Sequence, residues 1–221
     1  MNFLRPQLQS PIRARIVPFI VFLVLTFCQG EFGEEGRYWF YLGKTLVGLW
    51  LVYEMRPLVE EMRWAVSWEA VAVGTAVCAM WVGIDGWYRK FGEEGTPWNP
   101  VAQFHERPAL AWLFIGVRMF GSSVVVPPLE ETFYRSFLYR YFVKTDFRAM
   151  PLNRFHGLSF CVTSILFGFE HHEWLSGILC GMAYQWLVIR KNRLGDAMSA
   201  HAITNFLLGV WVVWRGAWHF W

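Results

Sequence analysis

Long apolar runs follow one another along most of the chain, and they constrain its fold more than any other feature. They span residues 16–28, 38–52, 66–84, 109–126, 133–143, 156–169, 174–189 and 197–214. A helix that crosses the hydrocarbon core of a bilayer needs about 20 residues, and several of these runs approach that length. Some runs are apolar on every side, which the surface helix of a soluble protein is not. We therefore predict an all-α, multi-pass transmembrane bundle of about seven or eight helices.

The composition of the chain also favours a membrane protein. Hydrophobic residues make up 55% of the chain, which includes 14 Trp and 20 Phe, whereas soluble domains hold about 45–50% apolar residues. Trp and Tyr gather at the ends of the runs, for example at Trp87, Tyr88, Trp174 and Trp214. Such amphipathic rings suit the headgroup level of a membrane. A soluble protein with a large helical core is the alternative, and the succession of apolar runs disfavours it.

Cationic residues are distributed unevenly between the two sides of the predicted bundle. With the N-terminus in the cytoplasm and residues 109–143 counted as one crossing, twelve cationic residues fall on the cytoplasmic side and five on the other. The twelve are Arg5, Arg13, Arg15, Arg56, Arg63, Arg140, Lys144, Arg148, Arg154, Arg190, Lys191 and Arg193, and the five are Arg37, Arg89, Lys90, Arg107 and Arg215. This bias follows the positive-inside rule. We predict an integral protein of a bacterial plasma membrane with a cytoplasmic N-terminus.

The chain is predicted to form a single transmembrane domain over residues 1–221, because it contains no internal repeat, low-complexity tract or long linker. The first apolar run precedes no small-x-small cleavage site, so we interpret it as an uncleaved anchor. The net charge of +3 is mild, and no basic stripe with interleaved aromatic residues indicates nucleic-acid binding. The longest polar connection, residues 85–108, is rich in Gly and Pro and predicts a loop outside the bilayer. Few candidate buried ionisable residues precede this loop, and many follow it.

Three clusters of polar side chains lie in or beside the runs that follow this loop. The first contains Glu130, Glu131 and Arg135, the second contains Glu170, His171 and His172, and the third contains His201 and Asn205. Placing a charge near the bilayer centre costs at least about 3 kcal/mol, so an ionisable residue inside a span is a functional hypothesis by default.

The first cluster follows two prolines, and we expect Pro127 and Pro128 to break one helix and to start the next. Both glutamates then lie at a helix start, where free N–H groups and the helix dipole favour carboxylates. Glu131 and Arg135 are four residues apart and share a helix face, whereas Glu130 points about 100° away. We therefore predict that Arg135 pairs with Glu131 and leaves Glu130 free for chemistry. A simple interfacial charge cluster is the alternative.

The second and third clusters place histidines at the ends of short apolar runs. The runs on either side of His171 are each shorter than the hydrocarbon core, so a tight hairpin between them would place His171 and His172 below the membrane surface. Phe167 lies four residues before His171 and can pack beside its ring. His201 and Asn205 share a helix face, and helix-packing hydrogen bonds are the alternative for this pair.

Together, these side chains have the groups that peptide hydrolysis needs. A carboxylate and an imidazole that face one water can deprotonate it, and a second imidazole with a carboxamide can donate hydrogen bonds to an oxyanion. Since no serine or cysteine lies in a recognisable nucleophile motif, we predict direct attack by water. The competing interpretation is a zinc site built from Glu130, His171, His172 and His201. The chain lacks an HExxH motif, so we expect no cofactor.

Three motifs occur in order after the loop. Glu130, Glu131 and Arg135 form EExxxR, Phe167 and His171 form FxxxH, and His201 and Asn205 form HxxxN. Through these motifs, residues 126–209 resemble the CPBP family, which is also called Abi. The family includes type II CAAX prenyl proteases and bacteriocin-processing proteins. The chain departs from the pattern at Ser136, where bacterial members often have glycine.

The resemblance implies an intramembrane glutamate protease with assigned roles for the motif residues. It implies that Glu130 and His171 activate water, that His201 and Asn205 stabilise the oxyanion, and that Glu131 and Arg135 support the site. We expect an intramembrane endopeptidase whose partners are a membrane-associated peptide or protein substrate and the lipid bilayer. The alternative is a non-catalytic membrane adaptor or an immunity-type protein on the same fold.

Overall fold

The computed structural model of the protein describes residues 7–91 and 97–221. Arg5, Gly92 and Gly95, which entered the charge count and the loop assignment, lie outside them. The main helices are α1 (Arg13–Cys28), α2 (Gly33–Met55), α3 (Trp68–Gly83), α5 (Pro108–Phe120), α6 (Val126–Glu131), α8 (Gly157–Phe169), α9 (Trp174–Lys191) and α10 (Gly195–Arg215). The short ones are α4 (Pro100–Gln103) and α7 (Tyr139–Tyr141). The described residues form no β-strand, which confirms the all-α prediction.

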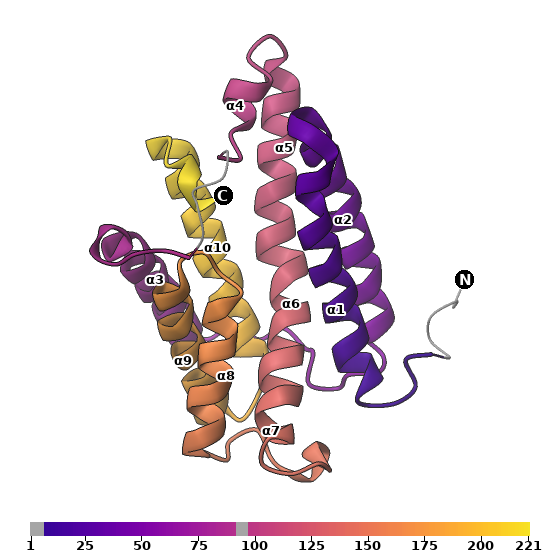
Figure 1. The fold of residues 1–221 in the computed structure, drawn as a ribbon. Helices are drawn as coiled ribbons and strands as arrows, with labels where there is room; N and C mark the ends of the chain where they lie inside the picture. The colour runs from indigo at the N-terminus through magenta and orange to yellow at the C-terminus, as the bar shows by residue number, and fades with distance from the viewer. Residues whose placement is uncertain (1–6, 92–96) are drawn as a thin grey trace.

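Three helical stretches of the described residues are long and apolar enough to cross a membrane: Arg13–Met55, Pro108–Tyr141 and Gly195–Arg215. The first turns back on itself between α1 and α2, which lie antiparallel (Figure 1). The start of α1 lies near the end of the molecule that holds α7, whereas α4 and the C-terminus lie toward the other end (Figure 1). The alternation of up and down helices is that of a multi-pass membrane bundle.

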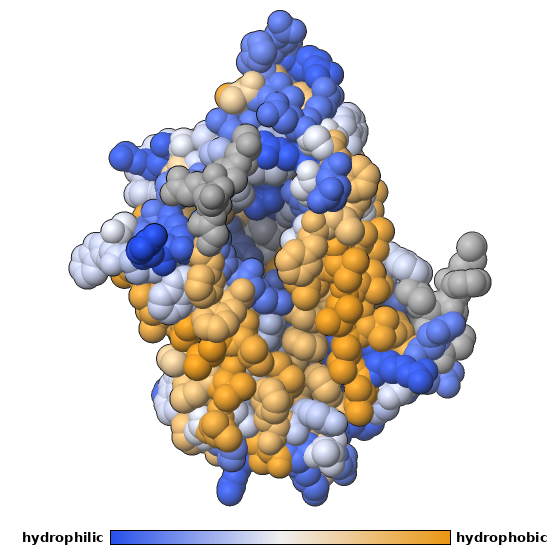
Figure 2. All heavy atoms as spheres, viewed as in Figure 1, coloured by the Kyte–Doolittle hydropathy of each residue, from blue (hydrophilic) through white to orange (hydrophobic). Residues whose placement is uncertain are grey.

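The surface carries a broad apolar zone between polar ends. Figure 2 shows hydrophobic residues over α1, α6 and α8, and hydrophilic residues around α7 and α4. Large apolar side chains are strongly exposed on several helices, including Phe27, Trp112, Leu158 and Trp214. A soluble protein rarely exposes so large a contiguous apolar surface to water, whereas the acyl chains of a bilayer would cover it. The protein is therefore an integral membrane protein.

Two helix pairs pack closely. The α3–α10 pair positions the third cluster, and the α8–α9 pair positions the second. A Cβ added at Gly74 of α3 would lie 2.6 Å from the Ala200 carbonyl oxygen of α10. A Cβ added at Gly168 of α8 would lie 2.6 Å from the Trp174 carbonyl oxygen, where α9 begins. Only glycine fits at these two contacts, so the backbones approach closely as small residues allow in membrane helices. The result at Gly168 is the tight hairpin that the short runs predict, with residues 170–173 as its turn.

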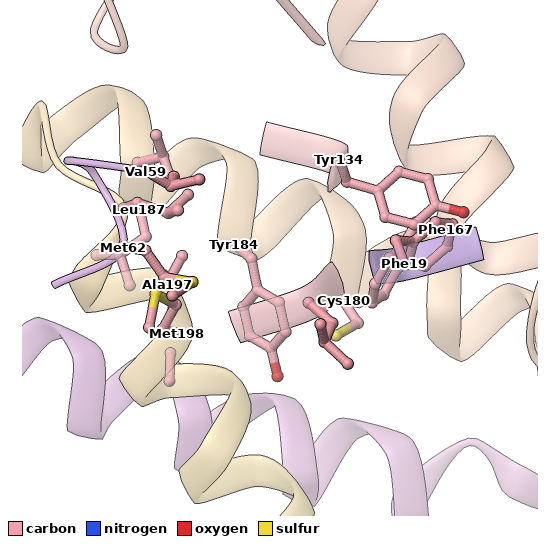
Figure 3. Close-up of a cluster of buried hydrophobic side chains, with 14 of the residues drawn as sticks. Phe19, Val59, Met62, Tyr134, Phe167, Cys180, Tyr184, Leu187, Ala197 and Met198 are labelled. Atoms are coloured by element: carbon pink, nitrogen blue, oxygen red, sulfur yellow. The ribbon is translucent and has the colours of Figure 1, made fainter. Parts of the chain in front are cut away.

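The core lies between these helices and the first helical hairpin. Figure 3 shows Phe19, Tyr134 and Phe167 gathered beside Cys180 and Tyr184, with Leu187, Ala197 and Met198 farther along the same cluster. Phe19 of α1 meets the Tyr134 ring edge-on at 5.6 Å, and Tyr134 meets Phe167 of α8 at 5.2 Å. These rings connect the N-terminal hairpin to the helices that carry the histidines.

The predicted helix break at the two prolines is wrong. Helical residues run without interruption from Pro108 to Tyr141, so Glu130 and Glu131 lie inside a helix and not at its start. Two π-helical turns, Gly121–Val125 (η3) and Thr132–Leu138 (η4), flank α6. A proline lacks an N–H and its ring collides with the preceding turn, and the wider π turn before Pro127 accommodates both. The continuous stretch Pro108–Tyr141 is compatible with the prediction that residues 109–143 make a single crossing.

A buried ion network joins α1 to α7 at the end of the molecule that holds α7. Arg15 and Arg140 both donate to Glu61, at 2.5 and 2.6 Å. Arg15 Nε and Arg140 Nη2 also donate to Ser136 Oγ, each at 2.9 Å. The Ser136 hydroxyl thus accepts a hydrogen bond from each of two guanidiniums, and a glycine at this position could not. This gives the departure from the family pattern a structural role.

This network makes a pH-dependent contribution to stability. Burial alone would raise the pKa of Glu61, but Arg15 and Arg140 outweigh it and hold the pKa below its ordinary value of 4.5. A lowered folded-state pKa means that the carboxylate stabilises the fold above the unfolded pKa and loses this effect as the pH falls. We expect Glu61→Gln to lower the free energy of unfolding by about 1–3 kcal/mol at pH 7. Thermal unfolding in detergent should show the difference shrinking below pH 4.5, and a pH-independent difference would contradict this account.

Candidate active site

The first proline and the π turn before it leave one backbone carbonyl without a donor. In this turn the Val126 N–H bonds to the Gly121 carbonyl, and Pro127 has no N–H to offer. The Ser122 carbonyl therefore lacks a partner within its own helix. Asn205 of α10 fills this position, since its Nδ2 donates to the Ser122 oxygen at 2.8 Å. One N–H of the carboxamide is used in this bond, and the second remains for the cavity that Asn205 lines.

Glu131 is fully buried and is held from two sides. Its Oε2 lies 3.2 Å from Arg135 Nε, which confirms the predicted ion pair. Its Oε1 lies 3.0 Å from His201 Nδ1, a contact that the sequence did not predict. Arg135 is in turn positioned by the Phe167 ring, whose centroid lies 4.2 Å from the guanidinium carbon. A buried charge persists when it is paired in this way, so Glu131 has a structural role that also fixes the His201 ring.

His201 is further positioned by aromatic and hydroxyl groups from three helices. The Tyr184 ring of α9 stacks on the imidazole at a centroid distance of 5.2 Å. The Tyr184 hydroxyl donates to Thr204 Oγ1 at 2.7 Å, and Thr204 lies 2.9 Å from the Gly74 carbonyl oxygen of α3. With Nδ1 on Glu131, the ring directs Nε2 toward Glu130, whose Oε2 lies 4.0 Å away.

Glu130 differs from its neighbour in being only partly enclosed by protein. Its side chain is 16% exposed, against 0% for Glu131. Its Oε2 is itself buried and accepts no hydrogen bond from the described residues. The Arg135 ion pair is therefore made by Glu131, while Glu130 lines the cavity, as the helical-face argument predicts.

His171 stands at the turn of the α8–α9 hairpin in a defined tautomer. Its Nδ1 lies 2.9 Å from the Phe167 carbonyl oxygen, so Nδ1 carries the proton and Nε2 is the acceptor of the neutral ring. Trp81 of α3 and Phe167 enclose the imidazole, at centroid distances of 5.4 and 5.0 Å. The predicted packing of Phe167 beside His171 is confirmed. The same Phe167 ring lies 6.1 Å from His201 and so separates the two histidines.

One cavity of about 550 Å³ brings the predicted catalytic residues together. It is lined by Glu130, Glu170, His171, His172, His201 and Asn205, among others, while Glu131 and Arg135 lie behind it in the protein. Figure 2 shows a hollow with hydrophilic residues that opens toward the end holding α4. A volume in this range suits a peptide segment or a ligand of similar size.

Two cavity residues were missed by the sequence analysis. Lys44 of α2 and Arg118 of α5 lie inside predicted spans and line the same cavity. Lys44 is one of the few buried ionisable residues that precede the long loop, and it is 5% exposed. The rule that an ionisable residue in a span is functional by default would have found both residues.

The zinc interpretation requires at least three ligands around one point. Within residues 7–91 and 97–221, no group of three or more His, Cys, Asp or Glu side chains is arranged to hold a metal ion. In particular, the contact of Glu131 with His201 orients that ring as a hydrogen-bond partner. The arrangement suits proton transfer and hydrogen bonding.

The chain also matches a known protein family. Residues 108–207 match the family model described as type II CAAX prenyl endopeptidase Rce1-like. The match begins at the start of α5, earlier than the resemblance drawn from the motifs, and it contains every predicted site residue. No curated protein and no solved structure matches the chain.

Proposed function

From the Rce1-like domain that residues 108–207 form, we propose that this chain is an intramembrane endopeptidase that activates water with a glutamate and a histidine. The observation that carries the proposal is the Glu130 carboxylate. Its side chain is partly exposed and lines a cavity that His171, His201 and Asn205 also line, and no described residue donates a hydrogen bond to its Oε2. A carboxylate placed in this way can bind a nucleophilic water.

In the proposed reaction, Glu130 takes a proton from a water that is also hydrogen-bonded to His171 Nε2. The hydroxide attacks the carbonyl carbon of the scissile peptide bond. A protonated His201, whose Nδ1–H is bound to Glu131, donates through its Nε2–H, and together with the free N–H of Asn205 it stabilises the oxyanion, as preorganised donors do in acyl transfer. When the tetrahedral intermediate collapses, the C–N bond breaks, the proton on Glu130 passes to the leaving amine and the carboxylate is regenerated. Arg135 takes no direct part and keeps Glu131 charged beside His201.

The test is peptide cleavage by purified protein. The full chain in detergent is incubated with a pool of synthetic peptides, and products are identified by mass spectrometry. Wild type should generate defined new termini, whereas Glu130→Ala should not. Equal cleavage by both proteins would remove the endopeptidase assignment and would favour the adaptor or immunity-type alternative.

We further propose that no metal takes part. A glutamate and histidine pair activates water without a Lewis acid, whereas a catalytic zinc site takes three protein ligands and supplies the lowered pKa of its water. Purified protein is expected to carry well under one zinc per chain by elemental analysis, and cleavage should survive prolonged EDTA treatment. Stoichiometric zinc that is lost on chelation, and that restores activity when returned, would overturn this mechanism.

We propose that the end of the molecule holding α7 faces the cytoplasm of a bacterial cell, with the N-terminus on the same side. The charge bias across the bundle supports this orientation. Lys144, which follows α7 and is exposed, offers a test. In Lys144→Cys, a membrane-impermeant thiol reagent should label the new cysteine in inverted vesicles and not in intact cells, with the wild-type chain as the background. Labelling in intact cells would reverse the orientation.

A further inference from the structure

Two cations lie in the cavity without a carboxylate partner. Lys44 Nζ donates to Thr26 Oγ1 at 3.2 Å and to Gln29 Oε1 at 3.0 Å, both of which are neutral. No ion pair forms between Lys44 and any described residue. An ammonium on a transmembrane helix is costly without a counter-charge. Lys44 is only 5% exposed. The Lys44 ammonium is therefore available to an anion that enters the cavity.

Arg118 is held by aromatic faces alone. Its guanidinium carbon lies 4.9 Å from the Tyr41 ring, 5.0 Å from the Trp98 ring and 5.8 Å from the Trp221 ring. In the described part of the chain, its N–H groups donate no hydrogen bond and meet no carboxylate. A guanidinium has five N–H donors in a planar fork that matches a carboxylate. The aromatic rings fix the position of the fork and leave its donors unused.

The positions of these cations relative to Glu130 fit one peptide. Arg118 precedes Glu130 by twelve residues on the same continuous helical stretch, which corresponds to about 18 Å along the axis. Lys44 Nζ lies 4.6 Å and the Arg118 guanidinium carbon 4.9 Å from the centroid of the Tyr41 ring, so the two cations lie close together in the cavity that Glu130 also lines. An extended peptide rises about 3.3 Å per residue. A carboxylate held by Lys44 and Arg118 therefore lies only a few residues from a peptide bond positioned at Glu130.

We propose that Lys44 and Arg118 form a carboxylate-binding subsite that holds an anionic group of the peptide substrate. The proposal rests on the endopeptidase function and names a feature of its substrate. The carboxylate belongs either to the C-terminus of the substrate or to an acidic side chain close to the scissile bond. The rings of Tyr41, Trp98 and Trp221 contact Arg118, and Lys44 is buried, so the subsite is partly shielded from water, which strengthens charge-assisted hydrogen bonds.

Binding of short peptides to an inactive chain tests the subsite. The full chain with Glu130→Gln is purified in detergent and titrated with two fluorescent tetrapeptide pools of randomised sequence, one ending in a free carboxylate and one in an amide. Fluorescence polarisation should give a Kd at least about 10-fold lower for the acid pool, as the loss of a charged hydrogen bond predicts. In the added backgrounds Lys44→Met or Arg118→Gln, the ratio of the two Kd values should approach one.

Further arms separate the subsite from general effects of charge and folding. Lys144→Met and Arg154→Gln remove exposed cations away from the cavity and should keep the ratio of the unmodified chain. Lys44→Arg and Arg118→Lys keep the charge and should retain most of the preference, which excludes misfolding as the cause of its loss. An amide pool with Asp at its last position should regain affinity if a side-chain carboxylate is the ligand, and should not if the C-terminus is.

Two results would overturn the subsite. One is equal affinity for acid and amide pools in the chain that keeps both cations. The other is an anionic phospholipid that copurifies with this chain, is lost in both variants and blocks peptide binding, because the ligand would then be a lipid phosphate. Acid-selective binding without cleavage of any peptide by wild type would preserve the subsite and remove the endopeptidase function. Cleavage by wild type together with equal affinities for the acid and amide pools would preserve the endopeptidase function and remove the subsite.

Discussion

Glu130→Gln is expected to lower kcat for peptide cleavage by about 10²- to 10⁴-fold, which is the usual contribution of a general base. The amide has nearly the shape of the carboxylate but cannot take a proton from water. Since Glu130 forms no hydrogen bond to the described residues through Oε2, its replacement should change the Tm by no more than a few degrees. The measurements are the initial cleavage rate and thermal unfolding of the same detergent preparation.

The matched control is Glu131→Gln, the same substitution one residue along the chain. This change removes the charge that Arg135 and His201 face at 3.2 and 3.0 Å, so it should reduce the Tm and the yield more than Glu130→Gln does. Its effect on kcat should be the smaller of the two, because the glutamine keeps an acceptor for His201. If Glu131→Gln instead abolished turnover in a stable protein while Glu130→Gln unfolded it, the two helix faces would be assigned the wrong way round.

Most of the architecture follows from the sequence because lipid imposes a simple rule. A chain in a bilayer must satisfy its backbone groups within helices, so each apolar run predicts a helix of its own length. The run at 16–28 lies within α1 (Arg13–Cys28), and the run at 197–214 lies within α10 (Gly195–Arg215). Charge bias alone indicated that residues 109–143 cross once, and the continuous stretch Pro108–Tyr141 agrees.

The sequence misled where the local geometry depends on more than local preference. Pro127 and Pro128 are strong helix breakers in isolation, yet the π turn Gly121–Val125 widens the helix before them and Asn205 supplies the missing donor to Ser122. That donor lies 83 residues away in sequence. No short-range pattern contains it, so a proline pair in a membrane helix reads as a break until its tertiary partner is known.

The site was predictable in its residues and less so in its contacts. A spacing of four residues predicts the Glu131–Arg135 pair because both lie on one face of any helix. The contact of Glu131 with His201 joins α6 to α10 and depends on how these helices pack. Lys44 and Arg118 were absent from the motifs, because motif spacing finds chemistry on one element while a cavity collects side chains from several.

The ion pair behind the cavity should prove to be the largest single electrostatic contribution to folding. Arg135→Met keeps an apolar side chain against Phe167 but leaves Glu131 charged, fully buried and paired only with His201. Removing one partner of a buried pair costs about 3–5 kcal/mol. We therefore expect Arg135→Met to reduce the free energy of unfolding by about that amount, measured by thermal or denaturant unfolding of the full chain in detergent.

A double-mutant cycle separates this electrostatic cost from loss of packing. In Arg135→Met with Glu131→Gln, no uncompensated charge is left, so the double variant should be more stable than the sum of the two single effects predicts. Residues in direct contact show such couplings of about 0.5–3 kcal/mol. Arg154→Met, at an exposed position, serves as the control and should change stability by less than about 0.5 kcal/mol. Strict additivity of the two buried changes would mean that Arg135 stabilises the fold through its contact with Phe167 and not through its charge. His201, which also faces Glu130, would then be the residue that stabilises the buried Glu131 carboxylate.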